Sequence, residues 1–482
     1  MQKQRNLEEM CSGVALGRET QVNAAPIRHK RKQPMSDQVP FNLKTVSDVD
    51  EARRLLTRRR GFEEPDLSDR MKAGIERVFG GPLTADQVVD RILKDVRERG
   101  GEAVRHYTTA FDGKAPEHFE VPRDQWQAAA DTIEPDLLEA LKVSASRIRA
   151  FHEKQLRTTW IDFSDEGALG QLIRPLERIG IYTPGGTALY PSTLLMTAIP
   201  AKVAGVGEII VCSPPGPDGS VSPLILATAL IAGVDRIFQV GGAQAIGAMA
   251  FGTESIPHVD KIYGPGNIFV VLAKQRVYGI VAIDQLPGPT ETLLVADDTA
   301  NPVITAADML AQAEHDAMAS AILITTSAEL ASAVRAELES QSAELPRCEI
   351  TRQSLATNGL IAIVPDIATA IDLANTYAPE HLCLLIADPW SVLPLVKHAG
   401  GVFLGEHSPE ALGDYTAGPS HVMPTGGTAR FSSPVHVQEF TKVISIAGVT
   451  RSTLETLAPA TMRIARAEGL EGHARAIEKR VQ

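Results

Sequence analysis

The pattern of apolar and polar positions changes character near Ile179. From there to about residue 404, short apolar runs bounded by Gly/Pro turns alternate with Ala-rich stretches of helical length. This alternation is typical of βαβ units with a parallel sheet. Strands are expected in two series, at Ile179–Tyr182, Glu208–Cys212 and Arg236–Val240, and then at Thr292–Ala296, Ala321–Thr325, Leu360–Val364, Leu382–Ala387 and Gly401–Leu404. We therefore predict an α/β fold with two α/β/α modules, covering residues 180–290 and 291–435.

The segments on either side of these modules have helical patterns. Thr84 and Gln87 have the spacing of a capping box that starts a helix, and Gly100-Gly101 would end it. A second helix is expected over roughly residues 134–155. We predict that residues 41–179 form a mainly helical part that packs with the second module, and that residues 436–482 form a helical C-terminal tail. Residues 1–40 are polar, basic and unpatterned, which predicts a flexible tail, with Met35 as an alternative first residue.

Composition narrows the classes of partner. The formal net charge of −12 at pH 7 favours solubility and disfavours nonspecific nucleic-acid binding, so the basic clusters 29–32 and 58–60 are interpreted as solvated segments. The chain lacks an apolar run of roughly 18 residues and the apolar core of a signal peptide, so we expect a cytoplasmic protein without a membrane anchor. Four cysteines without a CxxC pair argue against a disulfide framework or a Cys-rich zinc module. Cys383 is interpreted as a small buried hydrophobe in preference to a catalytic thiol.

Two glycine turns in the first module are candidates for nucleotide binding. The modules are Rossmann-like in their rhythm, but the usual G-x-G-x-x-G fingerprint of dinucleotide binding is missing. Gly241–Gly247 follows a predicted strand and opens a helix, so its backbone amides could bind an anion. Gly264-Pro265-Gly266-Asn267 is a second such turn, and its Asn suits a ribose or amide contact as well as it suits a turn. Taken alone, both signals fit tight turns without a ligand equally well.

A helix in the second module carries polar residues on one face. Asn301-Pro302 is a strong helix start, with Asn as the cap and Pro in the first turn. Asp308, Gln312 and His315 follow at spacings of four and three, which would place them on the same face. On this segment alone, a solvated face is favoured over a binding site.

Further along, Glu380-His381 lies between a predicted helix (roughly 366–377) and a strand. The pair offers two bases of different pKa, although a lone dipeptide is a weak signal. A long Gly-rich loop then contains Asp414 and His421, which can bind metal or move protons, and loops of this length are usually functional or disordered. His473, five residues after Glu468, would by itself be interpreted as a surface residue.

Read together, these segments resemble the histidinol dehydrogenase family over roughly residues 80–475. The resemblance rests on IGIYTPGG (179–186), VGGAQAI (240–246), YGPGN (263–267), QAEH (312–315), PEHL (379–382), GDY (413–415), GPSHVMPTGGTAR (418–430) and EGLEGH (468–473). It implies the oxidation of L-histidinol to L-histidine in two NAD-linked steps through the aldehyde, in histidine biosynthesis, with one zinc ion per site. It also implies a homodimer in which the C-terminal tail of one subunit completes the other's site.

The resemblance also implies roles for individual residues. Glu380 and His381 would be the acid–base pair, with His381 assigned to the alcohol proton and Glu380 chiefly to water. The zinc ligands, which would also contact substrate, would be Gln312, His315, Asp414 and His473. Further substrate contacts would come from Thr290, His381, His421 and Glu468, and the NAD site would be lined by Tyr182, Gln244 and Asn267.

Elementary chemistry supports part of this set. His315, Asp414 and His473 are normal zinc ligands, whereas the neutral amide of Gln312 is a poor one. Thr290 stands where the family usually has Ser, which keeps the hydroxyl and adds a methyl group. Two enzyme alternatives remain open at this stage: a dehydrogenase of another small polyol, such as a sulfonated diol, on the same scaffold, and a zinc hydrolase that uses Glu380 to activate water. A non-catalytic scaffold is the least favoured reading.

Overall fold

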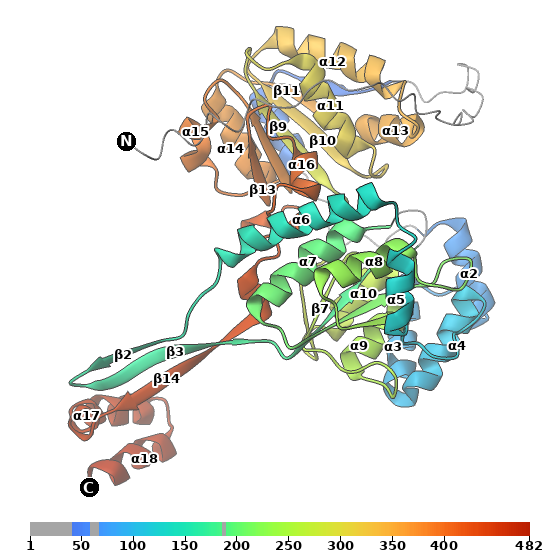
Figure 1. Cartoon of the computed structure of the whole chain (residues 1–482). Coiled ribbons are helices and arrows are strands. Elements are labelled where there is room, and N and C mark those ends of the chain that lie inside the picture. Colours follow the sequence, from blue (N-terminus) through green and yellow to red (C-terminus); the bar gives the residue numbers. More distant parts are fainter. Residues whose placement is uncertain (1–40, 58–66, 186–188) are drawn as a thin grey trace, which may run out of the picture. The chain divides into compact units, whose positions relative to one another are not determined.

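Two parallel β-sheets, each covered by helices, form the main body of the protein (Figure 1). The structure, a computed structural model, describes residues 41–57, 67–185 and 189–482. The described residues belong to a compact unit spanning residues 40–482, of which the sheets are subdivisions. The predicted flexible tail, Met35 and the basic cluster 58–60 lie outside the described residues.

The first module contains a five-stranded parallel sheet in the order β6-β5-β4-β7-β8. Its strands are β4 (Arg178–Tyr182), β5 (Glu208–Ser213), β6 (Arg236–Gln239), β7 (Lys261–Tyr263) and β8 (Ala282–Ile283), and its helices are α7 (Pro191–Ala204), α8 (Pro223–Ala232), α9 (Gly242–Phe251) and α10 (Ile268–Val277). Ile209 and Val211 of β5 belong to one buried cluster, and Ile210 and Cys212 belong to the other. This alternation covers both faces of the sheet, which is why the four central residues of the strand, 209–212, are all apolar.

The second module contains a six-stranded parallel sheet in the order β1-β11-β10-β9-β12-β13. Its strands are β1 (Lys44–Val46), β9 (Glu291–Ala296), β10 (Ser320–Thr325), β11 (Leu360–Ile363), β12 (His381–Leu385) and β13 (Gly401–Leu404). Its helices are α11 (Pro302–Ala313), α12 (Ala328–Ser342), α13 (Cys348–Asn358), α14 (Ile367–Tyr377), α15 (Pro389–Val392) and α16 (Glu410–Tyr415). Counted from β4 in the first module and from β9 in the second, five strands of each module have the order 3-2-1-4-5, and β1 adds a sixth strand at one edge of the second sheet. The predicted α/β class is therefore confirmed. The strands β1, β7 and β8 were not among the predicted strands.

The N-terminal helices divide between the modules. They are α1 (Val49–Thr57), α2 (Asp69–Phe79), α3 (Ala85–Arg99), α4 (Gly101–Asp112), α5 (Arg123–Ala130) and α6 (Pro135–Glu153). Of these, α1 packs with β1 on the second sheet, as predicted. The prediction is wrong for the others, because α3 and α4 pack on α9, and α5 and α6 pack on α7 and α8. The helices α9 and α3 pack closely at Gly247, where a Cβ would lie 3.1 Å from the Leu93 side chain and would require that side chain to shift.

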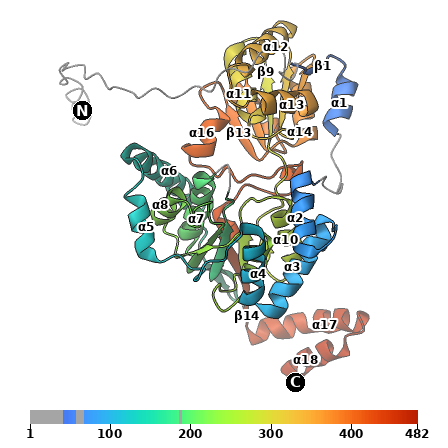
Figure 2. The same ribbon diagram turned by 90° about the vertical axis from the view of Figure 1, so that its right-hand side faces the viewer.

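A three-stranded antiparallel sheet projects from the first module, with the C-terminal helices at its far end (Figures 1 and 2). It consists of β2 (Trp160–Ser164), β3 (Gly167–Pro175) and β14 (Thr441–Val449), and it is followed by α17 (Arg451–Ala467) and α18 (Glu471–Val481). We call β2, β3, β14, α17 and α18 the arm. The predicted all-helical tail is thus wrong for residues 441–449, which form a strand paired with β3. No helix of the described residues is both long and apolar enough to cross a bilayer.

Candidate functional site

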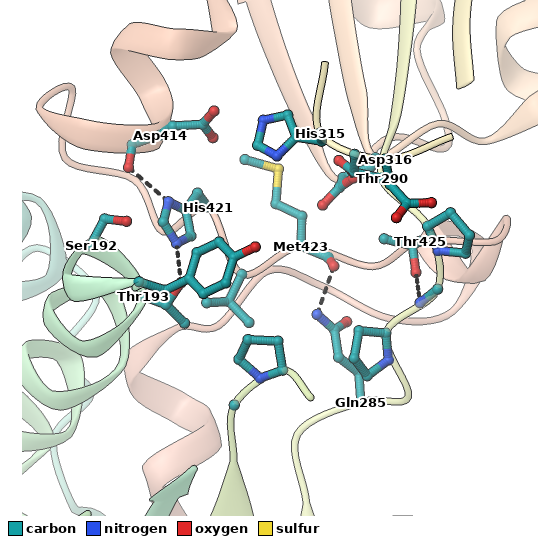
Figure 3. A pocket seen from close by; sticks show the side chains of 18 of the residues that line it. Ser192, Thr193, Gln285, Thr290, His315, Asp316, Asp414, His421, Met423 and Thr425 are labelled. Atoms are coloured by element: carbon teal, nitrogen blue, oxygen red, sulfur yellow. Dashed lines mark hydrogen bonds between the residues drawn. The ribbon is translucent and has the colours of Figure 1, made fainter. Parts of the chain in front are cut away.

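A cavity of about 510 Å³ lies where the two modules face each other. The first module contributes the segments that follow β4 and β7, and the second contributes the segments that precede β9 and β12. Figure 3 shows side chains from both modules around this space. Eight of the predicted site residues line it: Asn267, Thr290, Gln312, His315, Glu380, His381, Asp414 and His421.

Glu380 enters the cavity just before β12, at the end of a strained turn. Ala378, which caps α14, has a φ of 54° and is followed by Pro379, so the helix cannot continue. The Glu380 Oε2 atom accepts hydrogen bonds from the Thr290 hydroxyl (2.6 Å) and from the Glu291 backbone N–H (3.0 Å). Burial raises the pKa of Glu380, and the charge of His381 together with these two hydrogen bonds only partly offsets it. A carboxyl group held in this way can exchange protons nearer to neutral pH than an exposed one.

His381 is the first residue of β12 and is almost fully buried. Its Nδ1 atom lies 3.1 Å from the Glu291 carbonyl oxygen, so Nδ1 bears a proton. Its Nε2 atom lies 3.7 Å from Asp414 Oδ1 and has no hydrogen-bond partner among the described residues. Burial lowers the pKa of His381, but Glu380, Asp414 and Glu410 outweigh it and raise the pKa to about 10.

His315 and Asp414 border the same part of the cavity (Figure 3). α11 ends at Ala313, so His315 lies just beyond the helix and not on it as predicted, with its N–H bonded to the Gln312 carbonyl. Asp414 is within α16, a short helix in the segment that was predicted to be an irregular loop. Burial lowers the pKa of His315 and so favours its neutral form. Burial opposes ionisation of Asp414, but the positive charge of the nearby His381 lowers the pKa of Asp414 overall.

Gln312 is buried behind Thr290, where its amide approaches the Thr290 hydroxyl to 2.5 Å. The amide satisfies most partners when its oxygen accepts from the Glu291 N–H (2.8 Å) and its nitrogen donates to Glu410 Oε1 (3.2 Å). Glu410, the first residue of α16, was not predicted as a site residue. Burial raises the pKa of Glu410 to about 7, and its Oε2 atom has no hydrogen-bond partner among the described residues. The motif around it gave no signal, because an acid after a proline is ordinary at a helix start.

His421 connects the two modules rather than presenting free nitrogens to the cavity. Its Nδ1 atom lies 2.7 Å from the Asp414 carbonyl oxygen, and its Nε2 atom lies 3.0 Å from the Thr193 hydroxyl in the first turn of α7 (Figure 3). Because a carbonyl only accepts, Nδ1 is the protonated nitrogen and Nε2 accepts from Thr193. Burial lowers the pKa of His421, which also favours this neutral form.

The residues predicted for NAD binding occupy different positions at the ends of the strands. Asn267 lines the cavity and caps α10, since its Oδ1 atom accepts from the Phe269 and Val270 N–H groups. Tyr182 ends β4, and its hydroxyl accepts from the Gly242 N–H at 3.1 Å. Gln244 lies in the first turn of α9, and its buried Oε1 atom has no partner among the described residues. Neither Tyr182 nor Gln244 lines the cavity itself.

The C-terminal candidates are not brought to the cavity within the chain. Glu468 and His473 are exposed at the junction of α17 and α18, on the arm, and neither lines the cavity. No group of three His, Cys, Asp or Glu side chains in the described residues is arranged to hold a metal ion. Cys383 is buried in β12, and burial raises the pKa of its thiol, as expected of a core residue.

The sequence and the fold are similar to those of known proteins over nearly the whole chain. The family model described as histidinol dehydrogenase matches residues 82–481. Histidinol dehydrogenase from Deinococcus radiodurans is 53% identical over 434 residues, which cover 90% of this chain and 98% of that protein. The one from Dehalococcoides mccartyi strain CBDB1 is 52% identical over 436 residues, covering 88% and 99%. The crystal structure of histidinol dehydrogenase from Elizabethkingia anophelis has a TM-score of 0.84 at 36% identity, covering 92% of this chain and 99% of that chain.

Proposed function

Because the chain belongs to the histidinol dehydrogenase family, we propose that it oxidises L-histidinol to L-histidine through L-histidinaldehyde, using NAD in both steps. The chain is an oxidoreductase of histidine biosynthesis. The observation that supports the chemistry most directly is the pairing of Glu380 and His381 at one wall of the cavity, with His315 and Asp414 beside them. The alternative of another small polyol is not favoured, because the relatives above are all histidinol dehydrogenases.

Alcohol oxidation needs a base for the hydroxyl proton while hydride leaves the carbon atom. His381 suits this role because Glu291 fixes its Nδ1–H, which leaves Nε2 as the nitrogen that can accept a proton. The three carboxylates around His381 keep it protonated when no cation is near. A zinc ion, when bound, would supply a positive charge that fixes the substrate and offsets these carboxylates. NAD would accept the hydride.

The second oxidation acts on the hydrated aldehyde, so a water molecule must be activated next to the same carbon. Glu380 suits this step because its pKa is raised by burial and because Thr290 and Glu291 hold Oε2 in place. The Thr290 hydroxyl keeps the hydrogen bond that a serine would make. Removal of a general base typically lowers a rate by about 10²- to 10⁴-fold.

The side chains around the cavity fit a zinc site in part. His315, with its pKa lowered toward the neutral ligand form, and Asp414 supply a nitrogen and a carboxylate. Gln312 would have to give up its hydrogen bond from the Glu291 N–H to offer its oxygen. We propose His473 of a second subunit as the remaining ligand and Glu468 of that subunit as a substrate contact, with His421 as a further substrate contact.

The exposed surface of the arm supports a homodimer. Phe163 is 76% exposed and Ile464 is 61% exposed, and Leu169, Val443 and Val449 are also on the surface. Apolar side chains gathered on one projecting element mark an interaction surface. A second copy of this chain is the partner that would also bring the exposed His473 to a cavity. We place the enzyme in the cytoplasm, where NAD and the biosynthetic substrate are available.

The test is product stoichiometry. Purified enzyme with L-histidinol and NAD should form two NADH and one L-histidine per substrate molecule consumed. One NADH with accumulated aldehyde would reduce the proposal to an ordinary alcohol dehydrogenase. Turnover of other polyols at a comparable kcat/KM, with little turnover of histidinol, would favour the polyol alternative. Absence of NAD binding would favour the hydrolase.

A further inference from the structure

A buried ion pair lies at the edge of the cavity in the first module, where its acid, Asp284, is one of the lining residues. Lys274 of α10 is 0% exposed, and its Nζ atom donates to Asp284 Oδ1 in the segment after β8. Neither side chain has a role in the proposed chemistry. Replacing a buried ion pair by apolar residues of similar volume often leaves stability unchanged or increased, so stability alone does not explain this pair.

Both members of the pair are bonded to the same residue of the Gly264–Asn267 turn. Lys274 Nζ donates to the Gly264 carbonyl oxygen at 2.9 Å, and Asp284 Oδ2 accepts from the Gly264 N–H at 2.8 Å. Gly264 has a φ of +110°, and a Cβ there would lie 2.0 Å from the Tyr182 carbonyl oxygen. The turn is therefore held at both polar groups of one peptide residue, in a conformation that only glycine adopts readily.

The held turn is part of the cavity wall on the side of the first module. Gly264, Pro265, Gly266 and Asn267 all line the cavity, and Asn267 begins α10. Asp284 is also linked through hydrogen bonds of Gln285 to the second module. The Gln285 N–H donates to Asp284 Oδ1 at 2.6 Å, and the Gln285 side chain donates to the Met423 carbonyl oxygen at 2.6 Å (Figure 3).

We infer that Lys274 and Asp284 are positioning residues that preorganise the Gly264–Asn267 turn for NAD. The inference rests on the proposed function, because it assigns the turn to the cofactor. Preorganised backbone binds more tightly than mobile backbone, since less conformational entropy is lost on binding. Loss of the pair should therefore weaken NAD binding and leave histidinol binding, which depends on the second module, nearly unchanged.

The experiment compares Lys274→Met, Asp284→Asn and the double variant Lys274→Met/Asp284→Leu with wild type. The matched control is Lys202→Met, which removes another lysine–carboxylate pair of the first module, Lys202–Asp235 (2.7 Å), at the amino end of β6 and away from the turn. Calorimetry with NAD+ and, separately, with L-histidinol gives both dissociation constants. Hydrogen exchange measured by mass spectrometry reports the mobility of residues 262–268, and thermal melting confirms folding.

We expect the double variant to remain folded and to bind NAD+ about tenfold or more weakly, with histidinol affinity within about threefold of wild type. Exchange in residues 262–268 should accelerate in this variant and not in Lys202→Met. Asp284→Asn, which keeps an acceptor for the Gly264 N–H, should lose less affinity than Lys274→Met/Asp284→Leu. If the single lysine variant does not fold, the Asp284→Asn and double variants still decide the matter.

Two results would overturn the inference, and they differ. If wild type binds NAD+ and the double variant binds it equally well, the positioning role is wrong and the proposed function stands. If wild type itself does not bind NAD+, the proposed function fails and this inference fails with it.

Discussion

The two α/β modules share a strand order but present opposite ends of their strands to the cavity. In the first module, the cavity is lined by residues that follow β4 and β7, at the carboxyl ends of adjacent strands. This is where parallel α/β sheets usually bind ligands, at the point where the strand order reverses. In the second module, Thr290 and His381 are at the amino ends of β9 and β12, which are the corresponding pair. The two modules thus share a topology, but one lines the cavity with the carboxyl ends of its strands and the other with the amino ends.

This difference gives different electrostatic character to the two walls of the cavity, which we call the first wall (first module) and the second wall (second module). Carboxyl ends of strands lead into helix N-termini, and the first turn of α7 and the cap of α10 border the cavity. Amino ends of strands follow helix C-termini, and α11 and α14 end next to Gln312 and Glu380. Helix N-termini favour anions and C-termini favour cations. The first wall therefore suits the phosphates of NAD, and the second suits a metal ion and a cationic substrate.

Removal of metal should have the largest effect and should affect one wall only. Incubation with a strong chelator is expected to abolish histidinol oxidation, because the His315 and Asp414 wall loses the charge that balances its carboxylates. Zinc should restore activity, and NAD+ affinity measured by calorimetry should stay within about twofold of the untreated enzyme. Full activity in enzyme shown to be metal-free by elemental analysis would contradict the zinc assignment.

The His381→Asn substitution should likewise affect the second wall and leave the first wall unchanged. We expect kcat to fall by about 10²- to 10⁴-fold, which is about 3–5 kcal/mol of barrier, with NAD+ affinity unchanged. His398→Asn, a histidine of the same module that does not line the cavity, is the control and should retain wild-type kcat. A decrease in NAD+ affinity comparable to the decrease in kcat would show that the two walls are not independent.

Mixing inactive subunits tests whether the second wall is completed by another chain. His381→Ala and His473→Ala are each expected to be inactive alone. Random exchange should restore about one quarter of the sites, because half of the dimers are mixed and each mixed dimer has one intact site. Confirmed mixed dimers with no activity would mean that His473 acts within its own chain, and an active His473→Ala enzyme would mean that His473 has no role in the site.

The smallest expected effect is on the free energy of unfolding. It arises from an acidic residue that is partly buried behind the second wall. Burial, with a contribution from Glu406, raises the pKa of Asp308 on α11 to about 6. The folded state therefore retains this proton longer than the unfolded state, and stability is lost as pH rises from about 4 to about 6. Asp308→Asn should be more stable than wild type by about 1–2 kcal/mol at pH 7.5, after allowance for solvent screening, and should gain little at pH 4. Urea unfolding at the two pH values gives the difference, and an equal gain at both would exclude ionisation as the cause.

Much of the fold could be predicted because its signals are local. The capping box of Thr84 and Gln87 forms both of its hydrogen bonds, and Asn301 caps α11 as its position before a proline indicates. The strand series appear at or within a few residues of the expected positions, since each is a short apolar run between turns. Glu380 and His381 could be selected as a pair because they precede such a run.

The remaining features depend on contacts between distant parts of the chain. β14 pairs with β3, some 270 residues earlier, and its solvent-exposed residues give no core pattern from which a strand could be recognised. The distribution of α3 to α6 onto the first sheet follows from surface complementarity, such as the close approach at Gly247, which a single sequence does not reveal. Glu410 was missed because its burial, and not its neighbours in sequence, distinguishes it from an ordinary helix-start acid.

If the arm joins two subunits as proposed, protein concentration becomes a variable in the behaviour of this enzyme. A second subunit that covers Phe163 and its neighbours on the arm would bind only a folded subunit. The apparent free energy of unfolding would therefore rise with total protein concentration by mass action. On dilution below the dissociation constant, each separated subunit would keep Glu380 and His381 but lose its neighbour's His473. Specific activity would then fall with dilution while NAD binding by the first module persisted, so the two walls would respond differently to one physical variable.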